Sequence, residues 1–548
     1  MRSRVTGRHT RRNLLKGVVG TGLAATVAGL SRRPGSAAGA RWAQEMDWQR
    51  FDDDVQAAME TFRMVGVAVA VVDRGGVVHQ ATFGPRDIAS GAPVTPETHF
   101  QVASTTKSMT SLMVATCVDD GLLAWDQPVR EIWPDFLAPT EEMTSTLRVR
   151  DLLGMDTGLG EEDARIAFHQ GYPTAADLLR SVSLLPVIAE PNTTFFYNGT
   201  VYATGGYLPA LAEGAAMAEL ETVYARQMTE RVYGPVGMAA ARITDDPRPF
   251  VTNYATGYGV DLTRGTSVVP YAAVGSYAPA GGTLATLTDM ANYVTMQLDE
   301  GVSITGDRVV SAANLAECWA PRIDIPLAPL APLAPILGPE VVSVGYGMGW
   351  NSQTYQDGRR FIFHAGGIDG FTSFIGFFPD DQLGLVVLTN MMPEPRGINF
   401  GPLYVPYLLA NQRFGLGAGM DEVIVAQYQA GEQRLTDLAA QVEPIDPEAI
   451  APYLGFYEKG WRLAFDTDGE LRLHQISRAL RLLAMPDGSY VIADGLTAGI
   501  PVHFSRDETG MPWLEIVNIE TARWLSSGPD VPVNPVHPAA TPVVAGAP

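Results

Sequence analysis

The fold of this chain is decided by the stretch Phe100-Gln101-Val102-Ala103-Ser104-Thr105-Thr106-Lys107-Ser108-Met109-Thr110-Ser111-Leu112-Met113. Ser104 and Lys107 are three positions apart, so on a helix their side chains share one face, with Cβ atoms about 5–6 Å apart. A serine hydroxyl becomes a useful nucleophile when a neighbouring base takes its proton, and an amine at this spacing can do so. The spacing therefore predicts a nucleophile and its base.

The residues around this pair predict a helix that begins at the serine. Apolar residues recur after it at helical spacing, and Gly121 follows as a C-terminal stop signal. Ser104 would then lie near a helix N-terminus, where unpaired N–H groups favour a developing negative charge.

Composition is that of a globular protein, and the charge excludes one class of partner. The 548 residues are 46% apolar and 18% charged, enough for two to four domains with a large core. The first forty residues carry a charge of +8, so the remainder carries −30 of a formal total of −22. So acidic a body argues against a nucleic acid partner.

Residues 1–40 are predicted to be a twin-arginine signal peptide. Arg11-Arg12 precedes a short apolar run, and Ala38-Gly39-Ala40 offers a cleavage site. We therefore expect export to the periplasm or secretion. The later sequence lacks a continuous apolar run long enough for a transmembrane helix, so no span is expected in the mature chain. Cys117 and Cys318 are the only cysteines, and neither belongs to a zinc-type cluster. We expect no metal and no cofactor.

The order of elements predicts an α+β fold in residues 41–420. β-prone segments occur early and late, with a mainly helical region over 121–240 between them; the segments are Met64–Val72, Val77–Phe83, Tyr346–Trp350, Arg360–Gly367, Gly370–Phe378 and Leu383–Thr389. This layout predicts one antiparallel sheet flanked by helices, with a helical subdomain.

The C-terminal third predicts a different architecture. A helix from Asp421 to Gln441 forms a linker over 421–445, and residues 446–528 then alternate as short strands with Asp-Gly turns, which predicts a small all-β barrel. Residues 529–548, rich in proline, valine and alanine, are expected to be a disordered tail. Residues 327–335 repeat Leu-Ala-Pro three times. Such proline spacing predicts an extended segment, as a flap over a cleft or a plain surface insertion.

Three motifs occur in a recognisable order: Ser104-x-x-Lys107, Tyr197-Asn198-Gly199 and His364-Ala365-Gly366-Gly367. With them, the sequence from about Val65 to Asn390 resembles the penicillin-recognising serine hydrolases, in the branch of class C β-lactamases, D-alanyl-D-alanine carboxypeptidases, D-aminopeptidases and related esterases. The resemblance implies a β-lactamase/transpeptidase-like fold. The C-terminal strands resemble the lipocalin-like domain of some members.

The resemblance also implies roles for the motif residues. Ser104 would be the acylated nucleophile, Lys107 its base, and Tyr197 a second proton acceptor. The backbone N–H groups of Ser104 and Gly367 would form an oxyanion hole. The residues expected to bind substrate are His364, Ala365, Gly366 and Asn198.

Three positions depart from the family pattern. Gly199 stands where the family usually has asparagine, and Met155 where relatives often have histidine. His364 takes the place of the lysine of β-lactamases and would supply a weaker, pH-dependent positive charge. A His-Ala-Gly motif is typical of peptidase, aminopeptidase and esterase members.

Our first hypothesis is an exported serine hydrolase acting on a small-molecule ester, a D-amino-acid amide or a peptide. One alternative is a true β-lactamase. Another is a catalytically weak binding protein for peptidoglycan fragments or a partner, which Gly199 motivates, and a zinc hydrolase is a third. The sequence leaves the oligomeric state open.

Overall fold

The centre of the molecule is an eight-stranded antiparallel sheet in the order β10-β11-β12-β13-β14-β15-β1-β2. The computed structural model describes residues 39–160, 174–392, 400–458, 461–475, 478–494, 498–517 and 520–526. The sheet consists of β1 (Val67–Asp73), β2 (Gly76–Phe83), β10 (Ile323–Ile325), β11 (Val341–Tyr346), β12 (Asn351–Tyr355), β13 (Arg360–Ile368), β14 (Phe371–Phe378) and β15 (Leu383–Thr389). Early and late segments meet where β1 pairs with β15, as predicted.

Both faces of this sheet are covered, which explains the unbroken apolar run of β1. Ala68, Ala70 and Val72 belong to the core shared with the helical subdomain. Val67, Val69 and Val71 point to the other face, against α2 (Trp48–Thr61) and α16 (Phe400–Phe414). A strand buried on both faces reads as a continuous hydrophobic stretch because neither side meets water.

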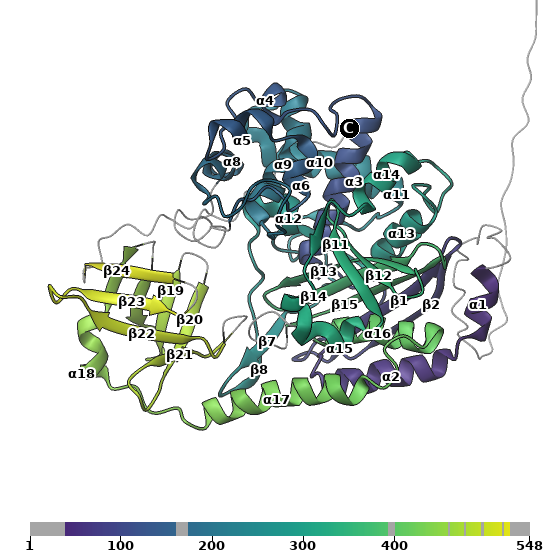
Figure 1. The fold of residues 1–548 in the computed structure, drawn as a ribbon. Helices are drawn as coiled ribbons and strands as arrows, with labels where there is room; N and C mark the ends of the chain where they lie inside the picture. The colour runs from purple at the N-terminus through teal and green to yellow at the C-terminus, as the bar shows by residue number, and fades with distance from the viewer. Residues whose placement is uncertain are drawn as a thin grey trace, which may run out of the picture.

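The helical subdomain lies on one side of the sheet (Figure 1). Its centre is α3 (Thr106–Asp119), in which residues 106–117 are all buried. The helices of this side are α4 (Val129–Ile132), α5 (Glu141–Thr146), α6 (Val149–Leu153), α8 (Ala175–Ser181), α9 (Gly199–Ala212), α10 (Leu220–Met228), α11 (Gly234–Val236), α12 (Ala278–Gly281), α13 (Leu287–Leu298) and α14 (Ala312–Trp319).

The C-terminal region is a closed barrel of eight antiparallel strands, joined to the sheet domain through α17 (Asp421–Ala439) (Figure 1). The strands are β17 (Gly455–Tyr457), β18 (Arg462–Phe465), β19 (Leu471–Gln475), β20 (Arg478–Ala484), β21 (Tyr490–Ile492), β22 (Pro501–Arg506), β23 (Pro512–Ile516) and β24 (Glu520–Ser526). Together with the sheet domain, this barrel confirms the expected fold class.

The barrel is attached to the sheet domain by a buried ion pair. Arg481 of β20 donates to Asp261 at 2.6 Å, and both side chains are almost fully buried. Asp261 ends β7 (Tyr258–Asp261), which forms a hairpin with β8 (Gly265–Val268).

Two local predictions were wrong. The Leu-Ala-Pro repeat is not extended, because Ala328–Leu333 forms the 3₁₀ helix η6 and Ala334–Leu337 forms α15. Proline is tolerated in the first turn of a helix, where Pro329 lies in η6 and Pro335 in α15. The strand expected over Tyr346–Trp350 ends at Tyr346, and Gly349 has a φ of 79°.

The remaining expectations concern the two ends of the chain, membrane-spanning helices, metal ligands and cysteines. Residues 1–38 of the predicted signal peptide and residues 529–548 of the predicted tail lie outside the described residues; Gly39 and Ala40 begin α1 (Gly39–Glu45). Within the described part of the chain, no helix has the length and apolarity to cross a membrane. The same residues contain no cluster of three potential metal ligands. Cys117 and Cys318 are both buried free thiols.

Candidate active site

Ser104 and Lys107 meet where a short 3₁₀ turn, η1 (Ala103–Thr105), passes into α3. Lys107 Nζ donates to Ser104 Oγ at 3.1 Å and to the Ala280 carbonyl of α12 at 2.9 Å. The Lys107 side chain is therefore held at both sides while Ser104 remains half-buried. Ala103, just before the serine, has a φ of 49°, a strained value for a residue with a Cβ.

Tyr197 joins this pair from a distant part of the chain. Its ring centroid lies 4.7 Å from Lys107 Nζ, and its residue immediately precedes the cap of α9. The ring also lies 6.4 Å from the ring of His364 on β13. A hydroxyl, an amine and a phenol-bearing ring thus converge from three separate elements.

The loop that carries Tyr197 is held in place by hydrogen bonds of the next residue, Asn198, to neighbouring segments of the framework. Asn198 caps α9 by accepting from Val201 N at 2.9 Å, and its Nδ2 donates to the Gly160 carbonyl at 2.9 Å. Its backbone N–H donates to Met155 Sδ at 3.1 Å. With Asn198 only 1% exposed, its amide serves the framework, and we remove it from the expected substrate-binding residues.

β13 brings the third motif against the serine. Its pairing with β12 ends at Phe363, so among the described strands the segment from His364 to Ile368 pairs with β14 alone. A Cβ on Gly366 would lie 2.2 Å from the Val102 carbonyl oxygen and 3.1 Å from Ser104 N. The backbone of β13 therefore packs directly on the nucleophile segment, a contact that only glycine permits.

Gly366→Ala is expected to reduce kcat/KM at least tenfold and to destabilise the fold by about 1–3 kcal/mol, as overpacking does. The added methyl group must separate β13 from Val102, which shifts the backbone of the adjoining Ser104. Esterase kinetics and urea unfolding measure the two effects. Gly358→Ala is the control for glycine replacement, since a Cβ there meets nothing within 4 Å, although its positive φ adds some strain. Unchanged kinetics in Gly366→Ala would show that this contact does not position the serine.

His364 is a neutral group in this site. Burial, and then the nearby charge of Lys107, lower the pKa of His364 to about 3. Nδ1 lies 2.6 Å from the Ala365 carbonyl and Nε2 lies 3.2 Å from the Tyr346 hydroxyl. A neutral ring that donates from Nδ1 and accepts at Nε2 satisfies both partners. The pH-dependent positive charge expected from the sequence is therefore absent at neutral pH.

The remaining residues of the third motif divide between the two faces of β13. Ala365 lies on the opposite face from His364, with Phe363, and its side chain lines a cavity behind the sheet. Gly367 is exposed near the end of the strand, beside Gly366. The structure thus brings together Ser104, Lys107, Tyr197, His364 and Gly366, with Gly367 next along β13, but not the side chains of Ala365 and Asn198.

Sequence reasoning missed two tyrosines that support the site. Tyr202 of α9 donates to the Lys107 carbonyl at 2.7 Å, and its oxygen lies 2.5 Å from Ser111 Oγ. Tyr346 contacts His364, and burial keeps the pKa of its phenol well above 10, so it stays a donor. Tyr346 begins a Tyr-Gly-Met-Gly-Trp segment that the sequence marked only as β-prone, and the three-dimensional arrangement is needed to show its contact with His364.

Comparison with known proteins points to one family. A family model described as Beta-lactamase matches residues 51–401. "Unguisins hydrolase ungD" of Aspergillus violaceofuscus is 28% identical over 73% of this chain and 70% of its own length. "Penicillin-binding protein 4" of Amycolatopsis lactamdurans is 25% identical over 63% of this chain and 84% of its own.

More distant matches also carry the names of β-lactamases and penicillin-binding proteins. "Beta-lactamase" of Escherichia coli is 23% identical over 62% of this chain and 88% of its own. The solved structure of the octameric penicillin-binding protein homologue from Pyrococcus abyssi matches 87% of this chain and 100% of its own, with a TM-score of 0.56 and 19% identity. At that identity, the structural match shows the fold alone.

Proposed function

The chain belongs to the beta-lactamase family, and on this premise we propose that it is a serine hydrolase that forms an acyl-enzyme on Ser104. The observation that carries the proposal is the convergence of Ser104, Lys107 and Tyr197. The hydroxyl and amine lie at hydrogen-bond distance, and the tyrosine ring lies beside the amine. The names of its relatives, which include hydrolases, a penicillin-binding protein and a β-lactamase, support this class of reaction.

In the proposed reaction, Ser104 Oγ attacks the substrate carbonyl carbon as its proton passes to Lys107 Nζ. The negative charge that develops on the carbonyl oxygen is stabilised by backbone N–H groups of Ser104 and Gly367. Collapse of this intermediate expels the alcohol or amine, which takes the proton from Lys107, and leaves an ester on Ser104. Water then attacks the ester as Tyr197 or Lys107 takes its proton, and that proton passes to Ser104 Oγ when the bond to the carbonyl carbon breaks and the acid is released.

The neutral state of His364 supports a substrate without a carboxylate at this position. β-Lactamase and carboxypeptidase substrates bear a carboxylate, for which a lysine at this place would provide an ion pair. Charge-assisted hydrogen bonds contribute about 1.5–3 kcal/mol, so a neutral imidazole forgoes roughly ten- to hundredfold in discrimination. We therefore propose esters or amides that lack a carboxylate as the substrate class, in preference to β-lactams.

A substrate panel tests this proposal. Wild type should hydrolyse p-nitrophenyl butyrate and D-alanine p-nitroanilide with a higher kcat/KM than nitrocefin or a D-alanyl-D-alanine peptide. The preference should hold from pH 8 to pH 5, since His364 gains a proton only near pH 3. His364→Lys should raise kcat/KM for the carboxylate substrates about tenfold, while His364→Gln, a neutral control, should not. Wild-type preference for nitrocefin would reject this substrate class while leaving the acyl-enzyme proposal intact.

A further inference from the structure

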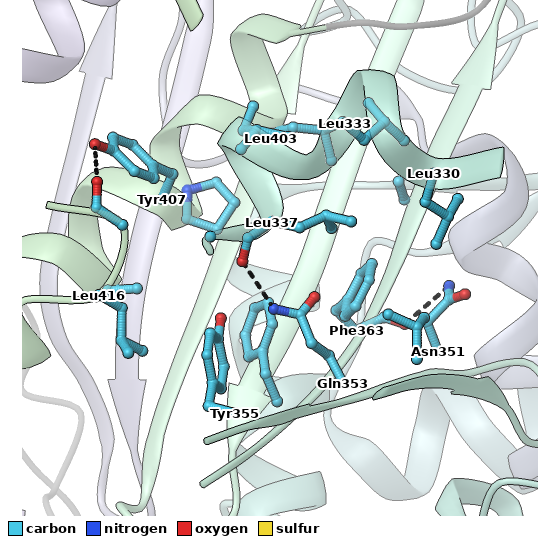
Figure 2. A pocket seen from close by; sticks show the side chains of 18 of the residues that line it. Leu330, Leu333, Leu337, Asn351, Gln353, Tyr355, Phe363, Leu403, Tyr407 and Leu416 are labelled. Atoms are coloured by element: carbon cyan, nitrogen blue, oxygen red, sulfur yellow. Dashed lines mark hydrogen bonds between the residues drawn. The ribbon is translucent and has the colours of Figure 1, made fainter. Parts of the chain in front are cut away.

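A cavity of about 230 Å³ lies behind the sheet, on the face of β13 opposite to His364. Ala365 and Phe363 of β13 form part of its floor, so the strand that reaches the serine separates the two sites. Other walls come from Tyr355 of β12 and from Leu403 and Ala410 of α16 (Figure 2). This cavity has no part in the proposed hydrolysis.

The Leu-Ala-Pro segment forms the roof of the cavity. Side chains three apart are eclipsed on a 3₁₀ helix, so the repeat places its leucines in one row while alanine and proline occupy the other faces. Leu330 and Leu333 of η6 line the cavity from this row, and Leu337 of α15, which follows the repeat, extends the roof (Figure 2). The period of three thus builds an apolar roof, which explains the repeat better than a plain surface insertion does.

The chemistry of the lining argues against a charged group inside the cavity. Among the described residues, those that line the cavity are uncharged, and most are aliphatic or aromatic. Its amides are engaged within the protein, with Gln353 Nε2 donating to the Leu337 carbonyl at 3.0 Å and Asn351 Nδ2 to the Phe363 carbonyl at 3.4 Å. Tyr407 donates its hydroxyl to the Gly417 carbonyl at 2.9 Å. The lining thus offers apolar contact and few free polar partners.

The size of the cavity and its surroundings indicate an occupant. An apolar cavity of about 150 Å³ lined by Leu, Ile and Phe binds benzene, and this one is larger. Leu330, Leu333 and Leu337 are half-buried, and Leu327, at the start of the repeat, is 41% exposed. Apolar side chains therefore continue from the cavity to the surface along the roof.

From these observations, we propose that the cavity binds one unbranched hydrocarbon chain of an amphiphile such as a fatty acid, with the polar head group outside. Only the methylene chain contacts the lining, so a carboxylic acid and an alcohol of equal chain length bind alike. The site operates independently of Ser104, because a strand of the central sheet lies between them.

Calorimetric titration with dodecanoic acid and with 1-dodecanol tests the proposal on the full chain. Both probes should bind with one-to-one stoichiometry, and butanoic acid should bind at least tenfold more weakly. Leu330→Trp fills the cavity from its roof and Ala410→Phe from α16, and each should weaken dodecanoic acid binding at least tenfold. Ala331→Trp is the matched control, since Ala331 is exposed on the same short helix and does not line the cavity; its affinity should equal that of wild type.

Three further readings make the outcome decisive. Circular dichroism and thermal unfolding show whether a filling variant is misfolded. If either Leu330→Trp or Ala410→Phe is misfolded, the dodecanoic acid affinity of the other variant tests the proposal. Turnover of p-nitrophenyl acetate should stay within twofold of wild type in Leu330→Trp, which separates this site from the catalytic one. The proposal is rejected if no saturable binding occurs up to 1 mM, if only the acid binds, or if both filling variants bind dodecanoic acid as tightly as wild type, which would locate the hydrocarbon chain elsewhere.

Discussion

Ser104→Ala is expected to lower kcat/KM for p-nitrophenyl butyrate by at least 10³-fold, because the variant has no atom on which to form the acyl-enzyme. Residual hydrolysis would come from the oxyanion donors and from substrate binding. Mass spectrometry after treatment with a fluorophosphonate should show one adduct on wild type, mapped to the peptide that contains Ser104, and none on the variant. Initial rates and the intact mass together measure both expectations.

Ser108→Ala is the matched control for this experiment. Ser108 lies one turn further along α3, is buried, and donates its hydroxyl to the Thr105 carbonyl at 2.8 Å. Ser108 lies on α3, which directly follows the turn that carries Ser104. The hydrogen bonds that hold the Lys107 amine go to Ser104 and Ala280, not to Ser108. The control should keep its kinetics within a few-fold. If Ser104→Ala retained a tenth of wild-type activity, or if the adduct mapped to another residue, the acyl-enzyme proposal would fail.

The features that sequence predicted are those with a local cause. The Ser-x-x-Lys spacing, the helix that follows it and the strands β13 to β15 each leave a pattern within ten or so residues. That early and late strands share one sheet, as β1 and β15 do, also followed from the order of β-prone and helical segments along the chain. Within the barrel, the six central strands follow from alternation and Asp-Gly turns.

What the sequence could not predict depends on contacts between distant residues. β17 and β24 close the barrel by pairing Phe456 with Ser526, and neither strand carries a hairpin turn that joins it to the other. The side of β13 that Ala365 faces depends on strand register, since a shift of one residue exchanges the two faces. From its motif, Asn198 was expected to bind substrate, but in the structure its side chain caps the N-terminus of α9.

The electrostatic state of the site also required the structure. A histidine in a sequence has an ordinary pKa near 6.5, and the predicted charge rested on that value. Burial beside Lys107 lowers the pKa of His364 to about 3, which removes the charge and changes the substrate class we propose. The tyrosine that hydrogen-bonds to this ring comes from β11, eighteen residues earlier, and from a strand that is not its direct neighbour.

Lys107→Met is expected to lower kcat/KM by about 10²–10⁴-fold, the usual contribution of a general base, while the Ser104 hydroxyl remains present. Methionine keeps most of the length and apolar volume of lysine but cannot accept a proton. Its effect corresponds to about 3–5.5 kcal/mol of lost transition-state stabilisation. The Ala280 carbonyl also loses its Lys107 donor, so a destabilisation of about 1–3 kcal/mol should appear in urea unfolding. Stopped-flow measurement of the acylation burst and equilibrium unfolding resolve the two effects.

Comparison with Tyr197→Phe then assigns the proton. If Lys107 is the base for acylation, Lys107→Met slows fluorophosphonate labelling of Ser104, whereas Tyr197→Phe leaves that rate within tenfold and mainly slows deacylation. Rapid labelling in Lys107→Met together with slow labelling in Tyr197→Phe would transfer the role of base to the phenol. Both variants keep Ser104, so the two results differ only in the group that receives its proton. The 3.1 Å contact between Lys107 Nζ and Ser104 Oγ favours the amine, because the shortest path for the proton is the hydrogen bond that already exists.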